Sequence, residues 1–375
     1  MRWLFFLVII LLFELVTYGA ARGVLWWAGN LLTGRAARQV MISLFVLSNA
    51  VLVFGMARLS SFGLKLSMTW LTLLWFTIMA VLAMAAINGL IMRFLPMLYQ
   101  SSLYQHMGVR LGALLWLFGF IGMGLYNAYM PTVRYISLTT EQPMPKPLRI
   151  AMASDLHLGR LVGHRELQGL KTIVTQQKAD VLLMPGDILD DDTHYYDKLH
   201  MQPTMQALVS ALPLGVYASL GNHDMYGHEA AIRQALQASG VRVLGDEQVN
   251  VNEQFWLVSR LDNHARYRQD TAKLMPSLID KPVILLDHEP TDIDKNVLLP
   301  IDLQLSGHTH NGQIFPANVI VKLFNKVSYG HARFNQTNVI VSSGYGFWGV
   351  PFRLGSQSEV WIIDLVPVKV PAKSK

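Results

Sequence analysis

The stretch that decides the fold of this chain is Gly221-Asn222-His223-Asp224, together with four shorter polar phrases around it. These read Asp155-Leu156-His157, Gly186-Asp187, Asp287-His288-Glu289 and Gly307-His308-Thr309-His310. One such phrase would be a weak signal, but five in this order over about 160 residues are hard to produce by chance. They combine carboxylates, imidazoles and an amide, which suits two adjacent metal ions. The sequence therefore predicts hydrolysis of a phosphate ester or a related bond.

Short apolar segments precede these phrases and have the length of buried strands. They cover residues 148–154, 180–184, 215–219, 283–286 and 303–305, with later ones at 339–343 and 359–364. Residues 165–177 and 229–239 have the periodicity of helices between them. This alternation predicts an α/β domain with helices over sheet faces, and ligands in such sheets collect at the carboxyl ends of strands.

The spacing inside the phrases indicates which side chains bind metal. Asp155 and His157 are two residues apart, so an extended backbone places them on one side, and His308 and His310 repeat that spacing. Asp187 has two oxygens and could bridge two ions, and Asn222 offers a neutral carbonyl oxygen. The chain has no cysteine, which excludes disulfides and thiolate ligands but does not fix the compartment.

The first 140 residues differ sharply in charge from the rest. They contain nine basic residues and a single acidic one, Glu14, which leaves 22 of the 31 basic and 24 of the 25 acidic residues for the remainder. A nucleic-acid-binding domain would carry its basic patch on the soluble part, so no nucleic-acid partner is predicted. Basic residues flanking apolar segments instead indicate a membrane region.

Four apolar segments approach the length of a bilayer-spanning helix, at residues 3–20, 40–56, 68–91 and 111–130. We therefore predict a multi-pass region over residues 1–132 with about four helices, a Pro-rich linker over 133–147, and a soluble domain over 148–370. An alternative for the first segment is a signal peptide cleaved near Gly19-Ala20-Ala21. The basic residues that flank the segments, Arg58 among them, number five on each side of the membrane. The sequence therefore does not decide on which side of the membrane the soluble domain lies.

With these phrases in this order, the chain resembles the calcineurin-like metallophosphoesterase superfamily over roughly residues 148–366. Residues 341–353, Val-Ser-Ser-Gly-Tyr-Gly-Phe-Trp-Gly-Val-Pro-Phe-Arg, are also similar to a bacterial branch with an N-terminal transmembrane segment. The resemblance implies a sandwich of two β-sheets flanked by helices. It implies one metal held by Asp155, His157, Asp187 and His310, and a second held by Asp187, Asn222, His288 and His308. It further implies that His223 faces the leaving group without binding metal, and that Asp224 orients His223.

Two features depart from the family pattern. Residues 257–263 read Leu-Val-Ser-Arg-Leu-Asp-Asn, where many relatives have a Gly-containing strand that ends in paired acids. Relatives that hydrolyse the lipid A precursor carry Arg at the position of His223, so a close match to that subgroup is not expected.

Asp190, Asp191 and Asp192 are interpreted as a solvated acidic loop. Tyr345, Phe347 and Trp348 either pack in the core or form the rim of the site.

The predicted function follows from charge and tethering. Two divalent ions, with Mn, Fe, Zn or Mg as candidates, would keep a net positive site for an anionic phosphate. The leading hypothesis is a phosphoesterase in the bacterial inner membrane that acts on a phosphorylated small molecule or lipid, with the bilayer as its partner. One alternative is a phosphodiesterase on soluble nucleotides that uses the membrane part only as an anchor. Another is a regulatory or binding module of a membrane protein.

Overall fold

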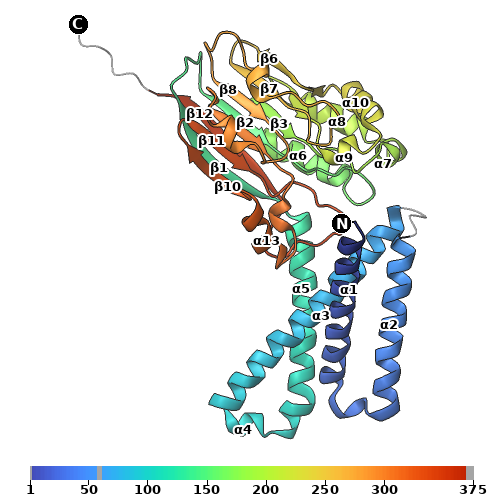
Figure 1. Ribbon diagram of the computed structural model, residues 1–375. Coiled ribbons are helices and arrows are strands. Elements are labelled where there is room, and N and C mark those ends of the chain that lie inside the picture. Colours follow the sequence, from blue (N-terminus) through green and yellow to red (C-terminus); the bar gives the residue numbers. More distant parts are fainter. Residues whose placement is uncertain (1, 57–60, 369–375) are drawn as a thin grey trace. The chain divides into compact units, whose positions relative to one another are not determined.

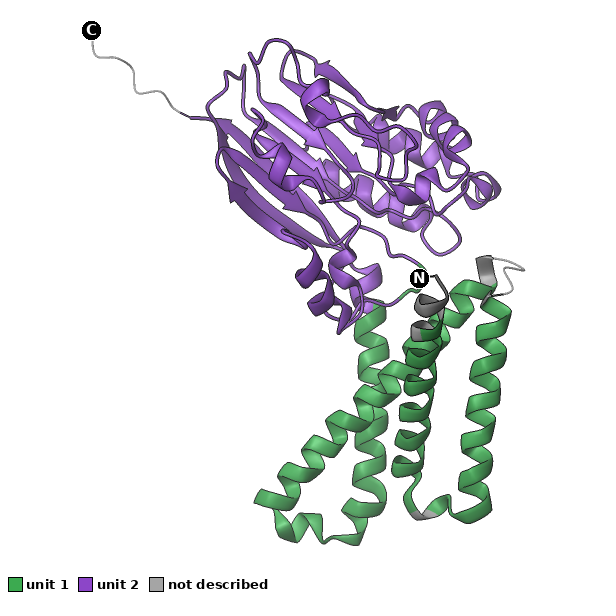
Figure 2. Cartoon of the chain, viewed as in Figure 1, with its two compact units in different colours: residues 1–125, 349–351 green, residues 126–348, 352–375 purple. Residues whose placement is uncertain are grey.

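The computed structural model describes residues 2–56 and 61–368 and divides the chain into two compact units (Figures 1 and 2). Unit 1 comprises residues 1–125 and 349–351, and unit 2 comprises residues 126–348 and 352–375. Arg58 and residues 369–370 of the predicted soluble domain lie outside the described residues.

Unit 1 is built from long apolar helices. Four helices are long and apolar enough to cross a membrane, in agreement with the sequence prediction. They are α1 (Arg2–Ala28), α2 (Gly34–Met56), α3 (Ser61–Phe94) and α5 (Val109–Tyr129), with short η1 (Gly29–Leu31), α4 (Pro96–Tyr99) and η2 (Tyr104–Gly108) between them. Helix α1 continues through Gly19-Ala20-Ala21 to Ala28, so the helical segment is longer than the predicted one.

Close helix contacts in unit 1 use small residues and polar side chains. A Cβ added at Gly19 would come within 3.0 Å of Ile78, and one added at Gly23 within 3.1 Å of Val81, so α1 packs tightly on α3. Between α2 and α3, the indole of Trp70 donates a 2.9 Å hydrogen bond to Ser48 Oγ. In a bilayer, apolar helices gain little by burying apolar surface from lipid, so such small and polar contacts hold them together.

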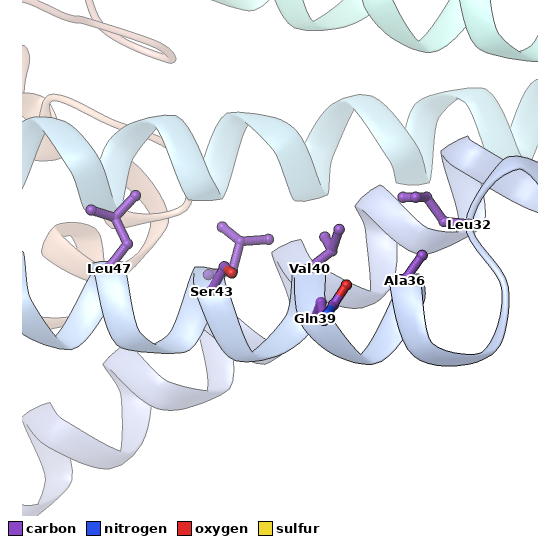
Figure 3. A pocket seen from close by; sticks show the side chains of 7 residues that line it. Leu32, Ala36, Gln39, Val40, Ser43 and Leu47 are labelled. Atoms are coloured by element: carbon purple, nitrogen blue, oxygen red, sulfur yellow. The ribbon is translucent and has the colours of Figure 1, made fainter.

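One hollow in unit 1 runs along a face of α2 (Figure 3). Its volume is about 360 Å³, and it is lined by Leu32, Ala36, Gln39, Val40, Ser43, Leu44 and Leu47. The lining has no titratable side chain, and its apolar character suits contact with acyl chains. We therefore place the chemistry of the protein elsewhere.

Unit 2 contains two six-stranded mixed sheets flanked by helices, the architecture that the resemblance implied. The first sheet has the order β1 (Thr132–Thr140), β12 (Glu359–Pro367), β2 (Leu148–Met152), β3 (Val181–Pro185), β4 (Val216–Ser219) and β5 (Arg242–Val243). The second has the order β10 (Gly330–Phe334), β11 (Thr337–Val341), β9 (Leu303–Ser306), β8 (Val283–Leu286), β7 (Phe255–Ser259) and β6 (Glu247–Val251). Strands β2 to β5 are parallel, as are β7, β8, β9 and β11.

The core follows the two-residue period of the strands. Ile150 and Met152 of β2 join one buried cluster with Leu286 and Leu305 of the second sheet, so this cluster fills the space between the sheets. Ala151, from the same strand, points to the opposite face and joins a cluster that includes helices α6 (His164–Gln176), α8 (Gln202–Val209) and α10 (Glu229–Ala238). The continuous apolar composition of β3 and β8 reflects burial on both faces.

The structure differs from the prediction in the segment after the last membrane helix. Residues 133–147 were expected to form a linker, but Thr132–Thr140 form edge strand β1, paired in parallel with β12 from Thr132 opposite Glu359 onward. The prolines that suggested a linker begin at Pro143. The preceding segment is rich in β-branched and aromatic residues, which favour strands. The irregular connection is therefore confined to residues 141–147.

Candidate metal centre

All seven predicted metal ligands lie just beyond the carboxyl ends of five strands. Asp155 and His157 follow β2, Asp187 follows β3, and Asn222 follows β4 and begins the short helix α9 (Asn222–Met225). His288 follows β8, while His308 and His310 follow β9. Because β2, β3 and β4 are neighbours in one sheet and β8 and β9 are neighbours in the other, these side chains converge at one edge of the sandwich.

The first group, which we call the first metal position, contains Asp155, His157 and His310. The Nε2 atoms of His157 and His310 are 3.1 Å apart. His310 Nε2 is 3.5 Å from Asp155 Oδ1, and His157 Nε2 is 3.8 Å from Asp187 Oδ2. Two imidazole nitrogens and two carboxylate oxygens therefore point at a common centre.

The second group, the second metal position, contains Asn222, His288 and His308. Asn222 Oδ1 lies 3.2 Å from His288 Nε2 and 3.0 Å from His308 Nδ1. His288 Nε2 is also 3.3 Å from Asp187 Oδ2. The same Asp187 oxygen thus faces both groups, whereas its other oxygen, Oδ1, accepts a 2.8 Å hydrogen bond from the backbone N–H of His223.

The backbone at these residues is held in an uncommon conformation. Non-glycine residues seldom adopt positive φ, and such strain is concentrated at functional sites. The left-handed residues include five of the seven candidate ligands, with φ from 47° to 69° at Asp155, His157, Asp187, His308 and His310. The sharp turns redirect each side chain from the strand direction into the shared centre.

Two glycines allow the groups to approach one another. A Cβ added at Gly186 would lie 2.3 Å from His288 Nδ1, and one at Gly221 would lie 2.2 Å from Asp187 Oδ1. Gly186 also has φ of 81°, which a side chain would strain. The glycines of the Gly-Asp and Gly-Asn phrases are therefore required by contact with the candidate ligands themselves.

The buried ionisable groups of the centre differ in the direction of their pKa shifts. Burial lowers the pKa of His288, but the carboxylates of Asp187 and Asp155 outweigh it and raise that pKa well above its ordinary value. Burial lowers the pKa of His157 to about 3, and burial together with nearby Arg353 lowers the pKa of His310, so both imidazoles are neutral. Burial raises the pKa of Asp155 to about 6. Burial opposes ionisation of Asp187 as well, but the imidazoles of His288, His157 and His223 outweigh it and hold the pKa of Asp187 below its usual range. Metals bind neutral imidazole and ionised carboxylate, so binding of a cation would release the proton that is favoured on His288.

The donor set fits two divalent ions. The ligand atoms of Asp155, His157 and His310 all lie within 4.8 Å of one another, as do those of Asp155, Asp187 and His288. These atoms are buried oxygens and nitrogens without sulfur, which suit Mn, Fe, Zn or Mg. Within the first position, the facing Nε2 atoms of His157 and His310 are better satisfied by one shared cation than by each other.

His223 lies beside the first position, where its ring, His157 and Asp190 offer ligand atoms within 4.8 Å of one another. Its ring centroid is 4.9 Å from that of His157, and its Nδ1 is 2.5 Å from Asp191 Oδ1. Burial lowers the pKa of His223, but the hydrogen bond to Asp191 and the charges of Asp187, Asp191 and Asp190 more than compensate and raise it. His223 therefore favours the protonated form that a general acid needs.

The structure corrects the predicted role of Asp224. Its carboxylate is fully buried and accepts hydrogen bonds from the backbone N–H groups of Gly221, Ile188 and Leu189, at 2.9 to 3.0 Å for the closest oxygens. Asp224 thus ties the Asp187 loop to the Asn222 loop, whereas Asp191 is the carboxylate that binds His223. Burial and the nearby charge of Asp187 raise the pKa of Asp224 to about 7. Asp191 was missed because its loop was interpreted as solvated, and half of its side chain is indeed exposed.

Two further supports of the centre were not predicted. Arg353 is fully buried, and its Nη2 lies 3.0 Å from His310 Nδ1 and donates to the carbonyl of Gly346. Asp287, next to His288, is fully buried between Arg260 and Arg268. Arg353 ends the C-terminal phrase and Arg260 lies in the segment that departs from the family pattern, so sequence signals existed for both.

The three aromatic residues after β11 divide between the two interpretations. Tyr345 is buried and its hydroxyl donates to the carbonyl of Glu166, and Phe347 is buried edge-on against Tyr129 with centroids 5.1 Å apart. Trp348 is 39% exposed, and its ring centroid lies 5.7 Å from that of His223. Tyr345 and Phe347 therefore pack in the core, and only Trp348 lies at the rim of the centre.

The chain is similar to several known proteins. The family model for calcineurin-like phosphoesterases matches residues 148–312. An uncharacterized metallophosphoesterase of Helicobacter pylori (strain J99) is 32% identical, over 69% of this chain and 70% of that protein. A Danio rerio protein named as a transmembrane protein with metallophosphoesterase domain is 31% identical, over 64% of this chain and 59% of its own length. Among solved structures, a dimetal phosphatase from Danio rerio covers 52% of this chain and 86% of that one, with 10% identity and a TM-score of 0.32.

Proposed function

Because the chain belongs to the calcineurin-like metallophosphoesterase family, we propose that it is a membrane-anchored phosphoesterase that uses two divalent metal ions. The reaction would be hydrolysis of a phosphate ester, a phosphodiester or a pyrophosphate. The observation that carries the proposal is the position of Asp187 Oδ2, which is 3.8 Å from His157 Nε2 on one side and 3.3 Å from His288 Nε2 on the other. One carboxylate oxygen between two imidazole groups is the arrangement expected of a bridging ligand.

The ligand charges support an anionic substrate. Asp155 and Asp187 are the two acids among the seven candidate ligands, and the imidazoles and the amide are neutral when they bind metal. Two divalent ions would leave the centre with a net positive charge, which attracts phosphate. When bound, such a pair would polarise the phosphoryl group and activate the attacking water.

His223 is the residue that would handle the leaving group. Its Nδ1 is occupied by Asp191, so Nε2 is the nitrogen that would donate a proton to the departing oxygen. The hydrogen bond to Asp191 and the surrounding carboxylates raise the pKa of His223 against the effect of burial, which favours the protonated ring. Trp348 lies over the same histidine and would contact the part of the substrate beyond the phosphate.

The membrane helices favour an amphiphilic substrate. An enzyme with four candidate spans works beside a bilayer, so a phospholipid or a lipid-linked pyrophosphate is available at high local concentration. We place the protein in a bacterial inner membrane and name manganese as the first metal to supply. The complete set of ligands and His223 favours catalysis over a purely regulatory module.

The test is a substrate panel with the full chain in lipid nanodiscs, loaded with Mn and checked for metal content. The panel contains bis-p-nitrophenyl phosphate, a long-chain lipid phosphate, a lipid pyrophosphate and soluble nucleotides. We expect Mn-dependent release of product from the lipid substrates. A sample with two metals per chain that hydrolyses none of them would overturn the proposal. Faster hydrolysis of nucleotides would establish the soluble-substrate alternative.

A further inference from the structure

The helix that follows the metal-binding His308 and His310 has its apolar face turned outward. Helix α13 (Ala317–Phe324) contains no buried residue. Leu323 is 78% exposed and Phe324 81% exposed, and Val319 and Ile320 are about half exposed. Their spacing of three and four residues places these four side chains on one face.

The opposite face of α13 carries Ala317, Asn318, Val321 and Lys322. Ala317 and Asn318 are partly buried, and a Cβ added at Gly355 would come within 3.1 Å of Asn318, so this face touches the rest of unit 2. A surface helix of a soluble domain normally directs its apolar stripe to the core. Helix α13 does the reverse, and it projects from the sandwich rather than covering a sheet (Figure 1).

Hydrogen bonds connect the start of α13 to the end of the last membrane span. The backbone N–H of Phe315 donates to Leu354 at 2.6 Å, so residues 314–315 lie beside residues 354–355. Residues 353–358 in turn hydrogen-bond to the last turn of α5. Asn127 donates to the carbonyl of Arg353, and Ser358 Oγ donates to the carbonyl of Ala128. The candidate span ends at Tyr129.

These contacts, all within unit 2, place α13 near the level at which the chain leaves the bilayer. The exposed face continues through Phe315 and Pro316, which precede the helix. Lys322 is exposed beside the apolar face, and its long side chain could reach lipid phosphate groups. An amphipathic helix of this composition lies along a membrane surface with its apolar side in the boundary between headgroups and acyl chains.

We propose that α13 is a membrane-surface anchor that inserts Val319, Ile320, Leu323 and Phe324 into the bilayer crossed by α5. The helix begins seven residues after His310, so its insertion would hold the metal centre close to the headgroup layer. The inference concerns membrane contact and does not depend on hydrolysis.

The absence of cysteine from the sequence allows a direct test. The full-length variant Leu323→Cys is labelled with bimane and reconstituted in vesicles of phosphatidylcholine and phosphatidylglycerol (3:1 mixture chosen as the probe) that contain doxyl-labelled lipid. The matched control is Leu278→Cys, because Leu278 is 67% exposed and lies on the amino-terminal side of β8, away from His288. We expect doxyl quenching at position 323 to exceed that at position 278 by about threefold or more.

Equal quenching at the two positions would overturn the proposal. Phe324→Cys provides a second probe of the same face, and retained metal binding shows that each variant is folded. A second copy of the chain is the competing occupant of this face. If quenching at position 323 rises as protein is diluted into excess lipid, or stays constant, lipid is the occupant. If dilution of the protein exposes the label to water and doxyl-labelled lipid does not quench it, the face binds a second copy of the chain and the proposal is wrong.

Discussion

The two halves of the metal centre differ in charge and in exposure. The first position has two carboxylates, Asp155 and the shared Asp187, together with His157 and His310, and all four side chains are buried. The second has only the shared carboxylate, completed by the amide of Asn222 and the imidazoles of His288 and His308. His308 is the most exposed of the seven candidate ligands.

This difference predicts unequal metal affinity. A carboxylate attracts a divalent ion more strongly than an amide oxygen does, and a buried pair is screened less by water. We therefore expect the first position to retain its ion during dialysis and the second to exchange.

The largest effect is expected from Asp187→Ala, because Asp187 Oδ2 faces both positions. The variant should lose both metals, and activity should fall by more than about 10⁴-fold, as when a catalytic unit loses an essential member. Elemental analysis and initial rates measure the two effects. Asp192→Ala is the matched control, since Asp192 caps its own loop through the N–H of His194. Two metals in purified Asp187→Ala would refute the bridging role.

The next largest effect is expected from His223→Ala, which should leave both positions filled. Loss of a general acid lowers kcat by roughly 10²–10⁴-fold. The deficit should shrink for substrates with a good leaving group such as p-nitrophenol, because that oxygen needs no proton to depart. Metal loss in this variant would mean that His223 is a ligand and that the role assigned to it is wrong.

The asymmetry itself is tested by Asn222→Ala. Removing the amide should weaken the second position by about 10- to 100-fold, comparable to other changes in metal environments, while the first position keeps its ion. Excess Mn should then restore much of the activity. Asp155→Ala is the informative partner, because it should empty the first position and resist rescue. Identical Mn titrations for the two variants would show that the positions are equivalent.

The strands that carry the ligands could be predicted from the sequence. Each precedes a polar phrase, and the continuous apolar composition of β3 and β8, which are buried on both faces, leaves little freedom in assigning them. Strand β1 was not predicted, because its pairing partner β12 lies more than 200 residues away and the nearby prolines indicated a linker. The orientation of α13 was equally inaccessible, since an apolar stripe alone does not show which side faces outward.

Within the site, ligand types could be predicted but supporting contacts could not. Asp224 is next to His223 in the sequence, whereas Asp191 is near it only in the folded protein. The loop conformations alone decide that Asp191 binds the imidazole. Phe347 and Trp348 are adjacent aromatics with opposite fates, one buried and one at the rim. Such differences depend on tertiary packing rather than on local residue pattern.

A smaller effect, on pH dependence, is expected from Asp191→Asn. Asp191 helps to raise the pKa of His223, so its neutralisation should lower that pKa. Because the general acid must be protonated, the alkaline limb of the kcat profile should move to lower pH, with roughly a tenfold loss of kcat near neutrality. Metal content should not change. An unshifted alkaline limb would show that Asp191 does not control the ionisation of His223.

The smallest effect is expected from Trp348→Ala, which tests whether the rim of the centre contacts the apolar part of a substrate. The indole is partly exposed 5.7 Å from the ring of His223, and Gln313 fixes its backbone through hydrogen bonds to both N–H and carbonyl. We expect kcat/KM for a long-chain lipid phosphate to fall about three- to tenfold, equivalent to an aromatic contact of about 0.5–1.5 kcal/mol, with little change for bis-p-nitrophenyl phosphate. Phe347→Ala is the contrasting variant, because it removes a buried ring and should lower the free energy of unfolding by about 3–5 kcal/mol. If Trp348→Ala impairs both substrates equally, the rim does not recognise acyl chains, and the case for a lipid substrate rests on membrane tethering alone.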